Sequence, residues 1–239
     1  MCESENMNGT LALCPSDFEK VCEFNKSFDF PVHSDMTDKK CMKLRLDLIR
    51  EELDELKTAF DKDFIEEQDA CADILYVAYG MAYTYGWNSD YIMDSKYVSI
   101  QNGTTLYTKI IYGSNTREEI LSKLFESFDK LEKSAYDNNI EHVIEYLHII
   151  IYNVYYFQYV SEYDSDRIFK IVHDSNMSKL CKNEEEAVMT VNDYKEKFEK
   201  GTSPYDSPYF YKLDNGLFVV KNKSTGKALK SINYIKVQL

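Results

Sequence analysis

Hydrophobic residues recur at helical spacing over most of this chain. In the segments 16–28, 38–60 and about 64–86, apolar side chains return every three or four positions, which is typical of amphipathic helices. Ser16 and Asp38 are suitable N-cap residues, and Pro31 ends the first segment. The pattern therefore predicts three helices, with the turn DKD between the second and the third.

Helical spacing resumes later in the chain, at 116–136, at 139–160 and from 184 to a stop at Gly201. Two other stretches carry β-branched and aromatic residues around turn sequences. One is 97–112, around an Asn-Gly pair, and the other is 209–230, with turns at 215–216 and 224–226. We therefore expect a mainly α fold, an antiparallel helical bundle with small β-hairpin additions.

The expected organisation has three parts. Residues 1–15 form a flexible N-terminus, 16–201 an all-α domain with a β insertion near 97–112, and 202–239 a C-terminal β-hairpin appendage. Pro204 and Pro208 indicate a linker before that appendage.

The segments 59–80 and 135–156 resemble each other when they are aligned without gaps, which predicts a degenerate helical repeat at 116–160. Asp69 then aligns with Glu145 and Asp73 with Ile149, so the second copy has mostly lost its acids. An inward-facing acid costs stability, and a copy without a catalytic role is expected to regain apolar residues. The alternative is that any two amphipathic helical hairpins look alike.

Acidic side chains interrupt two neighbouring predicted helices. Side chains three or four positions apart share a helix face, so each helix carries an acidic stripe beside apolar positions. The stripes are Glu51, Glu52 and Glu55 in the first helix, and Glu66, Asp69 and Asp73 in the second. Carboxylates crowded at low dielectric repel one another, and bound Mg²⁺ is the usual way to keep them ionised. The alternative is a solvated charged face, but Asp73 directly before ILYV is poorly placed for solvent alone.

Three motifs carry a resemblance to a known family. EExxE followed by DxxxDILYVxYG resembles the all-α nucleoside triphosphate pyrophosphohydrolases, the MazG and phosphoribosyl-ATP pyrophosphohydrolase group. VHDSNMSK at 172–179 is similar to the VHxSNxSK segment of the phosphoribosyl-ATP pyrophosphohydrolase-like branch, and GKALK at 226–230 resembles its terminal GKxxK. The resemblance is close over about 17–87 and 165–180 and thin over 226–234.

The resemblance implies cleavage between the α- and β-phosphates of a nucleotide, with Mg²⁺, or Mn²⁺ in its place, as the cofactor. The expected metal ligands are Glu52, Glu55, Asp69 and Asp73. Glu51 is the candidate to orient or deprotonate the attacking water; the alternative is a solvent-exposed neighbour. The chain has Ala70 where many members carry Glu, so either Asp69 or Glu66 completes the metal site.

The other two motifs would then bind the substrate, through Asn176, Lys179, Lys227 and Lys230. Ser175 is a further donor to phosphate or sugar. His173 and Asp174 are candidates to contact the base, although a structural histidine at a helix end is more common. Tyr76 either lines the pocket or packs in the core.

Composition excludes several other classes of function. The net charge of −13 argues against nucleic acid or an anionic membrane as a partner, because a duplex binder needs a basic footprint. The sequence has neither an apolar run of roughly 20 residues nor a signal peptide, so we expect a cytoplasmic protein. Six cysteines without CxxC pairs indicate reduced thiols rather than a zinc or redox site.

The sequence therefore predicts a Mg²⁺-dependent pyrophosphohydrolase that converts a (d)NTP, such as dUTP or dCTP, to the monophosphate and pyrophosphate. Two alternatives stay open: phosphoribosyl-ATP as the substrate, and a catalytically inactive scaffold that binds nucleotides or oligomerises. A homodimer is expected, because relatives are commonly dimers or tetramers.

Overall fold

The computed structural model describes residues 16–32, 36–87 and 115–239. The flexible N-terminus expected at 1–15 and the hairpin expected at 97–112 lie outside these residues. Within them, no helix has both the length and the apolar character needed to cross a membrane. The described chain is mainly α with a two-stranded antiparallel sheet, which confirms the predicted fold class.

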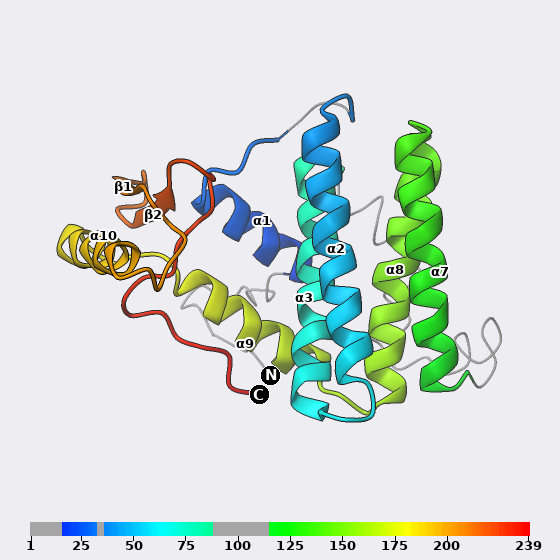
Figure 1. Cartoon of the computed structure of the whole chain (residues 1–239). Coiled ribbons are helices and arrows are strands. Elements are labelled where there is room, and N and C mark those ends of the chain that lie inside the picture. The colour runs from blue at the N-terminus through cyan, green and yellow to red at the C-terminus, as the bar shows by residue number, and fades with distance from the viewer. Residues whose placement is uncertain (1–15, 33–35, 88–114) are drawn as a thin grey trace, which may run out of the picture.

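The two predicted acidic helices form a pair, α2 (Lys39–Ala59) and α3 (Phe64–Thr84). Asp38 accepts hydrogen bonds from the first backbone N–H groups of α2, as the sequence predicts, and Asp63 does the same for α3. Because the turn between them is short, the helices run antiparallel and side by side (Figure 1).

A second antiparallel pair, α7 (Arg117–Tyr136) and α8 (Ile140–Val160), packs against the first (Figure 1). The side chain of Thr116 caps α7 in a capping box, and that of Asn139 caps α8. Fully buried side chains from all four helices fill the core, among them Leu53, Leu75, Leu131 and Val154. Each such burial contributes about 1.5–3 kcal/mol, so the apolar stripes hold the bundle together. An origin of this pair by duplication stays a prediction.

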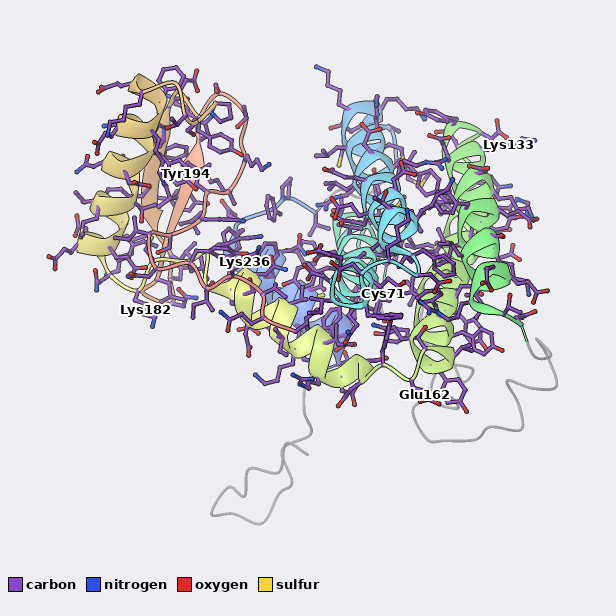
Figure 2. All side chains as sticks on the ribbon, turned by 60° about the horizontal axis from the view of Figure 1, so that its bottom comes forward. Cys71, Lys133, Glu162, Lys182, Tyr194 and Lys236 are labelled. Carbon is purple, nitrogen blue, oxygen red and sulfur yellow. The ribbon has the colours of Figure 1, made fainter. Side chains whose placement is uncertain are left out.

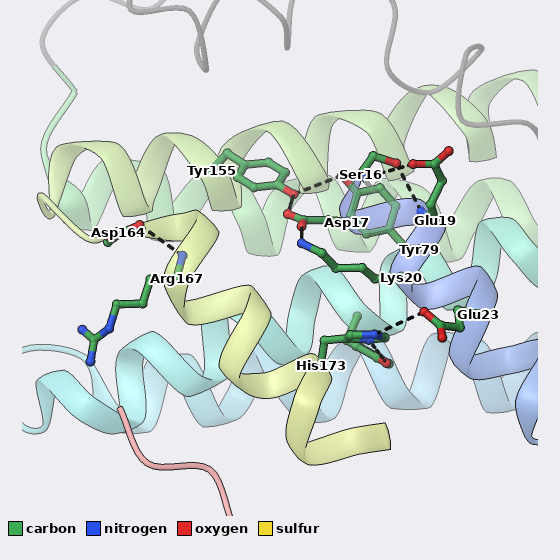
Figure 3. A network of polar contacts seen from close by, with 11 residues as sticks. Ser16, Asp17, Glu19, Lys20, Glu23, Tyr79, Tyr155, Asp164, Arg167 and His173 are labelled. Atoms are coloured by element: carbon green, nitrogen blue, oxygen red, sulfur yellow. Dashed lines mark hydrogen bonds and ion pairs between the residues drawn. The ribbon is translucent and has the colours of Figure 1, made fainter. Parts of the chain in front are cut away.

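Two shorter helices, α1 (Asp17–Ser27) and α9 (Ser165–Met177), lie on the flank of α3 away from α7 (Figure 1). Ser16 begins α1 with the predicted cap, here part of a capping box. A polar contact ties this flank to the bundle (Figure 3): the Tyr155 hydroxyl of α8 donates to Asp17 Oδ2 at 2.7 Å. Within α1, Lys20 Nζ lies 2.8 Å from Asp17 Oδ1.

The helix α10 (Glu184–Glu199) packs with the strands β1 (Pro208–Lys212) and β2 (Phe218–Asn222). We call these three elements the appendage; it stands apart from the bundle in Figure 1. It has its own apolar cluster, formed by Cys181, Ala187, Val191, Phe218, Val220 and Leu229. The predicted domain limits stay a prediction, but the packing shows that α10 associates with the hairpin.

The hairpin forms largely as predicted. Tyr209 pairs with Lys221 and Phe210 with Val220, and Gly216 has a positive φ of 86° in the connecting turn. Two details differ from the prediction. Pro208 begins β1 instead of ending a linker, and the second turn leads to an isolated bridge at Ala228 instead of another strand.

After the appendage, residues 231–239 run back to the bundle; we call this segment the tail (Figure 1). Tail residues bond to α9 and α10, and the Val237 and Leu239 side chains pack against the bundle core. The tail therefore connects the appendage to the bundle.

Candidate active site

Four acidic side chains gather where α2 packs on α3. Glu52 and Glu55 lie about one turn apart on α2, as do Asp69 and Asp73 on α3. The charge of Glu55 acts on the other three carboxylates, and those of Asp69 and Asp73 also act on Glu52. Buried neighbours on both helices, including Leu53, Leu56 and Ile74, fix which faces meet. The structure thus brings together the four residues predicted as metal ligands.

The two most perturbed acids are Glu52 and Asp73. Burial raises the pKa of Glu52 from 4.5 to about 8, and the Asp73 carboxylate is the next cause. Burial also raises the pKa of Asp73 from 3.8 to about 7, followed by the charge of Asp69, while the Lys179 ammonium acts in the opposite direction. A cluster of acids with such shifted pKa values is typical of functional sites.

The remaining acids surround this pair. Burial raises the pKa of Glu55, and the charges of Glu51 and Glu66 add to it. Both Glu51 and Glu66 are exposed, whereas Asp69 is half-buried. Ala70, the position at which the chain departs from the family pattern, is buried in the core. Position 70 therefore faces the core in this protein, and Asp69 supplies the carboxylate on the acidic face.

The predicted cations lie beside these acids. Burial lowers the pKa of Lys179, at the end of α9, and the Asp73 carboxylate raises it. The charges of Lys227 and Lys230 also act on Lys179, and that of Lys230 acts on Asp73. Positive charge from α9 and from the segment after β2 therefore meets negative charge from α2 and α3.

Asn176 and Ser175 take different roles at the end of α9. Asn176 Oδ1 accepts a hydrogen bond from Lys179 Nζ at 2.5 Å, which orients the lysine. Ser175 is buried, and its hydroxyl donates to the Ile235 carbonyl at 2.8 Å. This contact corrects the expectation that Ser175 donates to phosphate or sugar, because its single proton is used to hold the tail.

The contacts of His173, Tyr76 and Asp174 favour a structural role for each residue over a role in binding the substrate. The Nδ1 atom of buried His173 lies 3.1 Å from the Tyr76 hydroxyl, and its Nε2 lies 3.7 Å from Glu23 (Figure 3). Burial lowers the pKa of His173. The Tyr76 ring is buried against Phe169, and Asp174 pairs with Lys170 on the surface. None of these contacts supports a role in binding a base.

An open pocket of about 650 Å³ adjoins the acids, between the C-terminal half of α2 and the start of α3. Its lining combines three of the predicted acids with neighbours that the motifs do not include: Glu51, Asp54, Glu55, Thr58, Ala59, Lys62, Asp63 and Glu66. This volume lies within the usual range for small-molecule sites, about 300–1,000 Å³. The pocket therefore opens the edge of the acidic face at Glu51, Glu55 and Glu66 to solvent, whereas Glu52, Asp69 and Asp73 do not line it.

Comparison with known proteins agrees with this geometry. The family model for phosphoribosyl-ATP pyrophosphohydrolase matches residues 21–95, which include α2 and α3. The chain belongs to the all-α nucleoside triphosphate pyrophosphohydrolase superfamily. The match confirms the resemblance seen in the motifs and supports a pyrophosphohydrolase type of function.

A relative matches the chain over nearly its whole length. "Uncharacterized protein L479" of Acanthamoeba polyphaga mimivirus is 34% identical over 236 residues, which cover 93% of this chain and 93% of the relative. The similarity therefore extends well beyond the residues matched by the family model. No solved structure matches the chain.

The oxygen donors on the acidic face fit a hard divalent cation, since Mg²⁺ prefers carboxylate oxygens and water. Asp69 Oδ1 supports this fit, because it is buried and has no hydrogen-bond partner within residues 16–32, 36–87 and 115–239. Among the described residues, however, no three His, Cys, Asp or Glu side chains already converge as a ready metal site. A cation would have to draw these carboxylates together by rotation of their side chains.

Three charged residues near the site or beneath it are missed by the sequence motifs. Burial and the charges of Glu66 and Glu55 raise the pKa of Asp69, and Lys236, in the tail, acts in the opposite direction. Arg45, on α2, is half-buried against Gly80, and its Nε has no hydrogen-bond partner in the part of the chain that the structure describes. Glu67 is fully buried, pairs with Arg117 and accepts a hydrogen bond from the Tyr163 hydroxyl at 2.7 Å. No helical periodicity distinguishes these residues from ordinary surface charges, so the sequence gives no signal for them.

Proposed function

We propose that this protein hydrolyses a nucleoside triphosphate between its α- and β-phosphates and releases the monophosphate and pyrophosphate. The observation that carries this proposal is the meeting of two opposite charge clusters. Half-buried carboxylates from α2 and α3 adjoin lysines from α9 and from the segment after β2. A nucleotide with its divalent cation would complement both clusters, since the carboxylates suit the cation and the lysines suit the phosphates.

The residues to hold Mg²⁺, or Mn²⁺ in its place, are Glu52, Glu55, Asp69 and Asp73. The unpartnered Oδ1 of Asp69 and its half-buried position favour Asp69 over the exposed Glu66 as the fourth ligand. When bound, the cation neutralises phosphate oxygens and makes a bound water more acidic. The raised pKa values of Glu52 and Asp73 also fit this role, because acids that are costly to ionise alone gain most from a positive partner.

The other residues have separate tasks in this proposal. Glu51, exposed at the rim of the pocket, would orient the attacking water and accept its proton. The water oxygen bonds to the α-phosphorus, the bond to the bridging oxygen breaks, and pyrophosphate leaves. Lys179, held by Asn176, would bind the phosphates together with Lys227 and Lys230, which favours the charge of the leaving group.

The base and the sugar are the open part of the proposal. A pyrimidine deoxynucleotide such as dUTP or dCTP is our first choice, by analogy with the dUTP-cleaving relatives. Phosphoribosyl-ATP is the second candidate, because the matching family model carries that name. Cleavage occurs at the same α–β bond in both cases. A homodimer stays a prediction.

The test is release of pyrophosphate from a panel of NTPs, dNTPs and phosphoribosyl-ATP, with Mg²⁺, with Mn²⁺ and with EDTA. We expect metal-dependent release from one substrate or a small group of them. Asp73→Asn should abolish it, and Asp47→Asn, which changes an exposed acid of α2 that pairs with Lys43, is the matched control. If the folded protein binds nucleotides but releases no pyrophosphate from any of them, the catalytically inactive scaffold becomes the better description.

A further inference from the structure

The tail reaches the acidic face along a fixed path. The Ser231 hydroxyl bonds to Glu186 of α10, and the Ile232 amide donates to Thr190 Oγ1 at 3.1 Å. Further along, the Ile235 amide donates to Ser178 Oγ at 2.9 Å, and its carbonyl accepts from Ser175 at 2.8 Å. These bonds fix the backbone of the tail on both sides of the junction between appendage and bundle.

Lys236 lies between two of these anchors. Ile235, just before it, is held by the end of α9, and Val237, just after it, packs against the bundle core. Figure 2 shows Lys236 where the tail passes from the appendage towards the bundle. Because both neighbours are held in place, the Cα atom of Lys236 is restricted to a narrow range of positions. Because Ile235 is bonded to Ser178, which directly precedes Lys179, Lys236 lies beside the lysine whose charge acts on Asp73. The charge of Lys236 also acts on Asp69.

The environment of Lys236 differs from that of five exposed lysines that form ion pairs. Lys43, Lys130, Lys170, Lys197 and Lys200 each pair with an acid four residues away in the sequence, at 2.5–2.7 Å. Among the described residues, Lys236 forms no such ion pair, although it lies beside an acidic cluster. Within the described part of the chain, the charge of Lys236 is thus not neutralised by an ion pair.

We propose that Lys236 is a substrate-binding residue that contacts the phosphates of the nucleotide, and that the tail is a built part of the active site. This inference rests on the proposed function. With Lys179 and Lys230, Lys236 would place cations from three different segments around the phosphates. Because they approach from separate segments, they can contact different phosphate oxygens. The residues after the GKxxK motif would then contribute to the affinity for triphosphate and pyrophosphate.

The test compares Lys236→Met with Lys223→Met in the full chain. Methionine keeps most of the stem and removes the charge, and Lys223 is an exposed lysine of the turn after β2. Three quantities are measured: KM and kcat for the best nucleotide of the panel, the Kd for inorganic pyrophosphate with Mg²⁺, and the Kd for Mn²⁺ alone. Thermal melting verifies that both variants fold.

We expect Lys236→Met to raise KM and the Kd for pyrophosphate about tenfold, the effect of losing one hydrogen bond from a charged group. The affinity for Mn²⁺ should stay the same, and Lys223→Met should leave all three quantities unchanged. Lys236→Arg should retain most of the affinity, because it keeps the charge.

Other outcomes separate this inference from the proposed function. If the wild type hydrolyses nucleotides and Lys236→Met behaves like it, the role of Lys236 is overturned and the proposed function stands. If the wild type hydrolyses nothing but Lys236→Met still weakens pyrophosphate binding, the tail site is supported and the proposed function fails. A loss of Mn²⁺ affinity would instead show that Lys236 supports the acidic face, which overturns the phosphate role.

Discussion

The α2–α3 pair and the α7–α8 pair are both antiparallel helix pairs, but they differ in where their acidic side chains lie. In the first pair, Asp69 and Asp73 are half-buried and lie beside other carboxylates, which raises their pKa values. At the aligned positions of the second pair, Glu145 is exposed and position 149 is an isoleucine. Acids near the core do not help a helix to fold. They are expected to be kept there when they have a functional role. The contrast therefore locates the site on the first pair.

The strongest test of this contrast is to remove one acid from each pair. Asp73→Asn should lower kcat/KM for pyrophosphate release by about 100-fold or more, because it removes a proposed metal ligand from a preorganised site. Glu145→Gln, at the position aligned with Asp69, should stay within about twofold of the wild type, as is usual for exposed substitutions. Steady-state assays with saturating Mg²⁺ measure both. Equal losses in the two variants would contradict the assignment of the site to α2–α3.

A substitution at the contact between the two helix pairs should have a large effect on the stability of the protein. Arg117, at the start of α7, pairs with buried Glu67 of α3, and its guanidinium lies 5.1 Å from the ring centroids of Phe60 and Phe157. Arg117→Met leaves a buried carboxylate without its partner, so the free energy of unfolding should fall by about 3–5 kcal/mol. Urea unfolding measures this change. A loss below about 1 kcal/mol would show that the pair is dispensable.

The pH dependence of stability should also distinguish the α2–α3 pair, which carries Glu52 and Asp73, from the α7–α8 pair. The pKa values of Glu52 and Asp73 are raised to about 8 and about 7 in the folded protein. Above their ordinary values of 4.5 and 3.8, the unfolded chain releases protons that the folded chain keeps. Stability in EDTA should therefore fall as the pH rises from about 5 to 8, by several degrees in Tm.

Mg²⁺ should reverse this loss, and it should raise Tm more at pH 8 than at pH 5, because only ionised carboxylates bind the cation well. Glu52→Gln should flatten the pH profile in EDTA and reduce the effect of Mg²⁺. Scanning calorimetry at a series of pH values checks both statements. A profile in EDTA that is the same in Glu52→Gln and the wild type would exclude Glu52 as its source.

The smallest effect is expected on the exposed face of the second pair. Glu126 and Lys130 of α7 lie 2.6 Å apart, and both side chains are at least half exposed. Glu126→Gln should change the free energy of unfolding by no more than about 0.5 kcal/mol, because solvent and salt screen such pairs. It should leave activity unchanged. A larger loss in urea unfolding would mean that the second pair also depends on its acids.

The sequence by itself determined the helices and the identity of the acidic stripes. Helical periodicity and N-cap residues are local properties, so 38–60, 116–136 and 139–160 fold as the pattern predicts. The spacing of Glu52 and Glu55, and of Asp69 and Asp73, places each pair on one helix face before any tertiary contact exists. The turn at Gly216 is local in the same sense.

Only the tertiary structure decided which charges face one another. Burial and Coulomb interactions depend on distances between segments far apart in the sequence, which periodicity does not contain. Hence the sequence singled out Lys179 but missed Lys236, which the path of the tail brings to Asp69. It placed Ser175 on the substrate, whereas packing assigns that hydroxyl to the tail. The buried Glu67 and the exposed Glu66 are adjacent in the sequence, and only the packing of α3 against α7 and α8 makes them different.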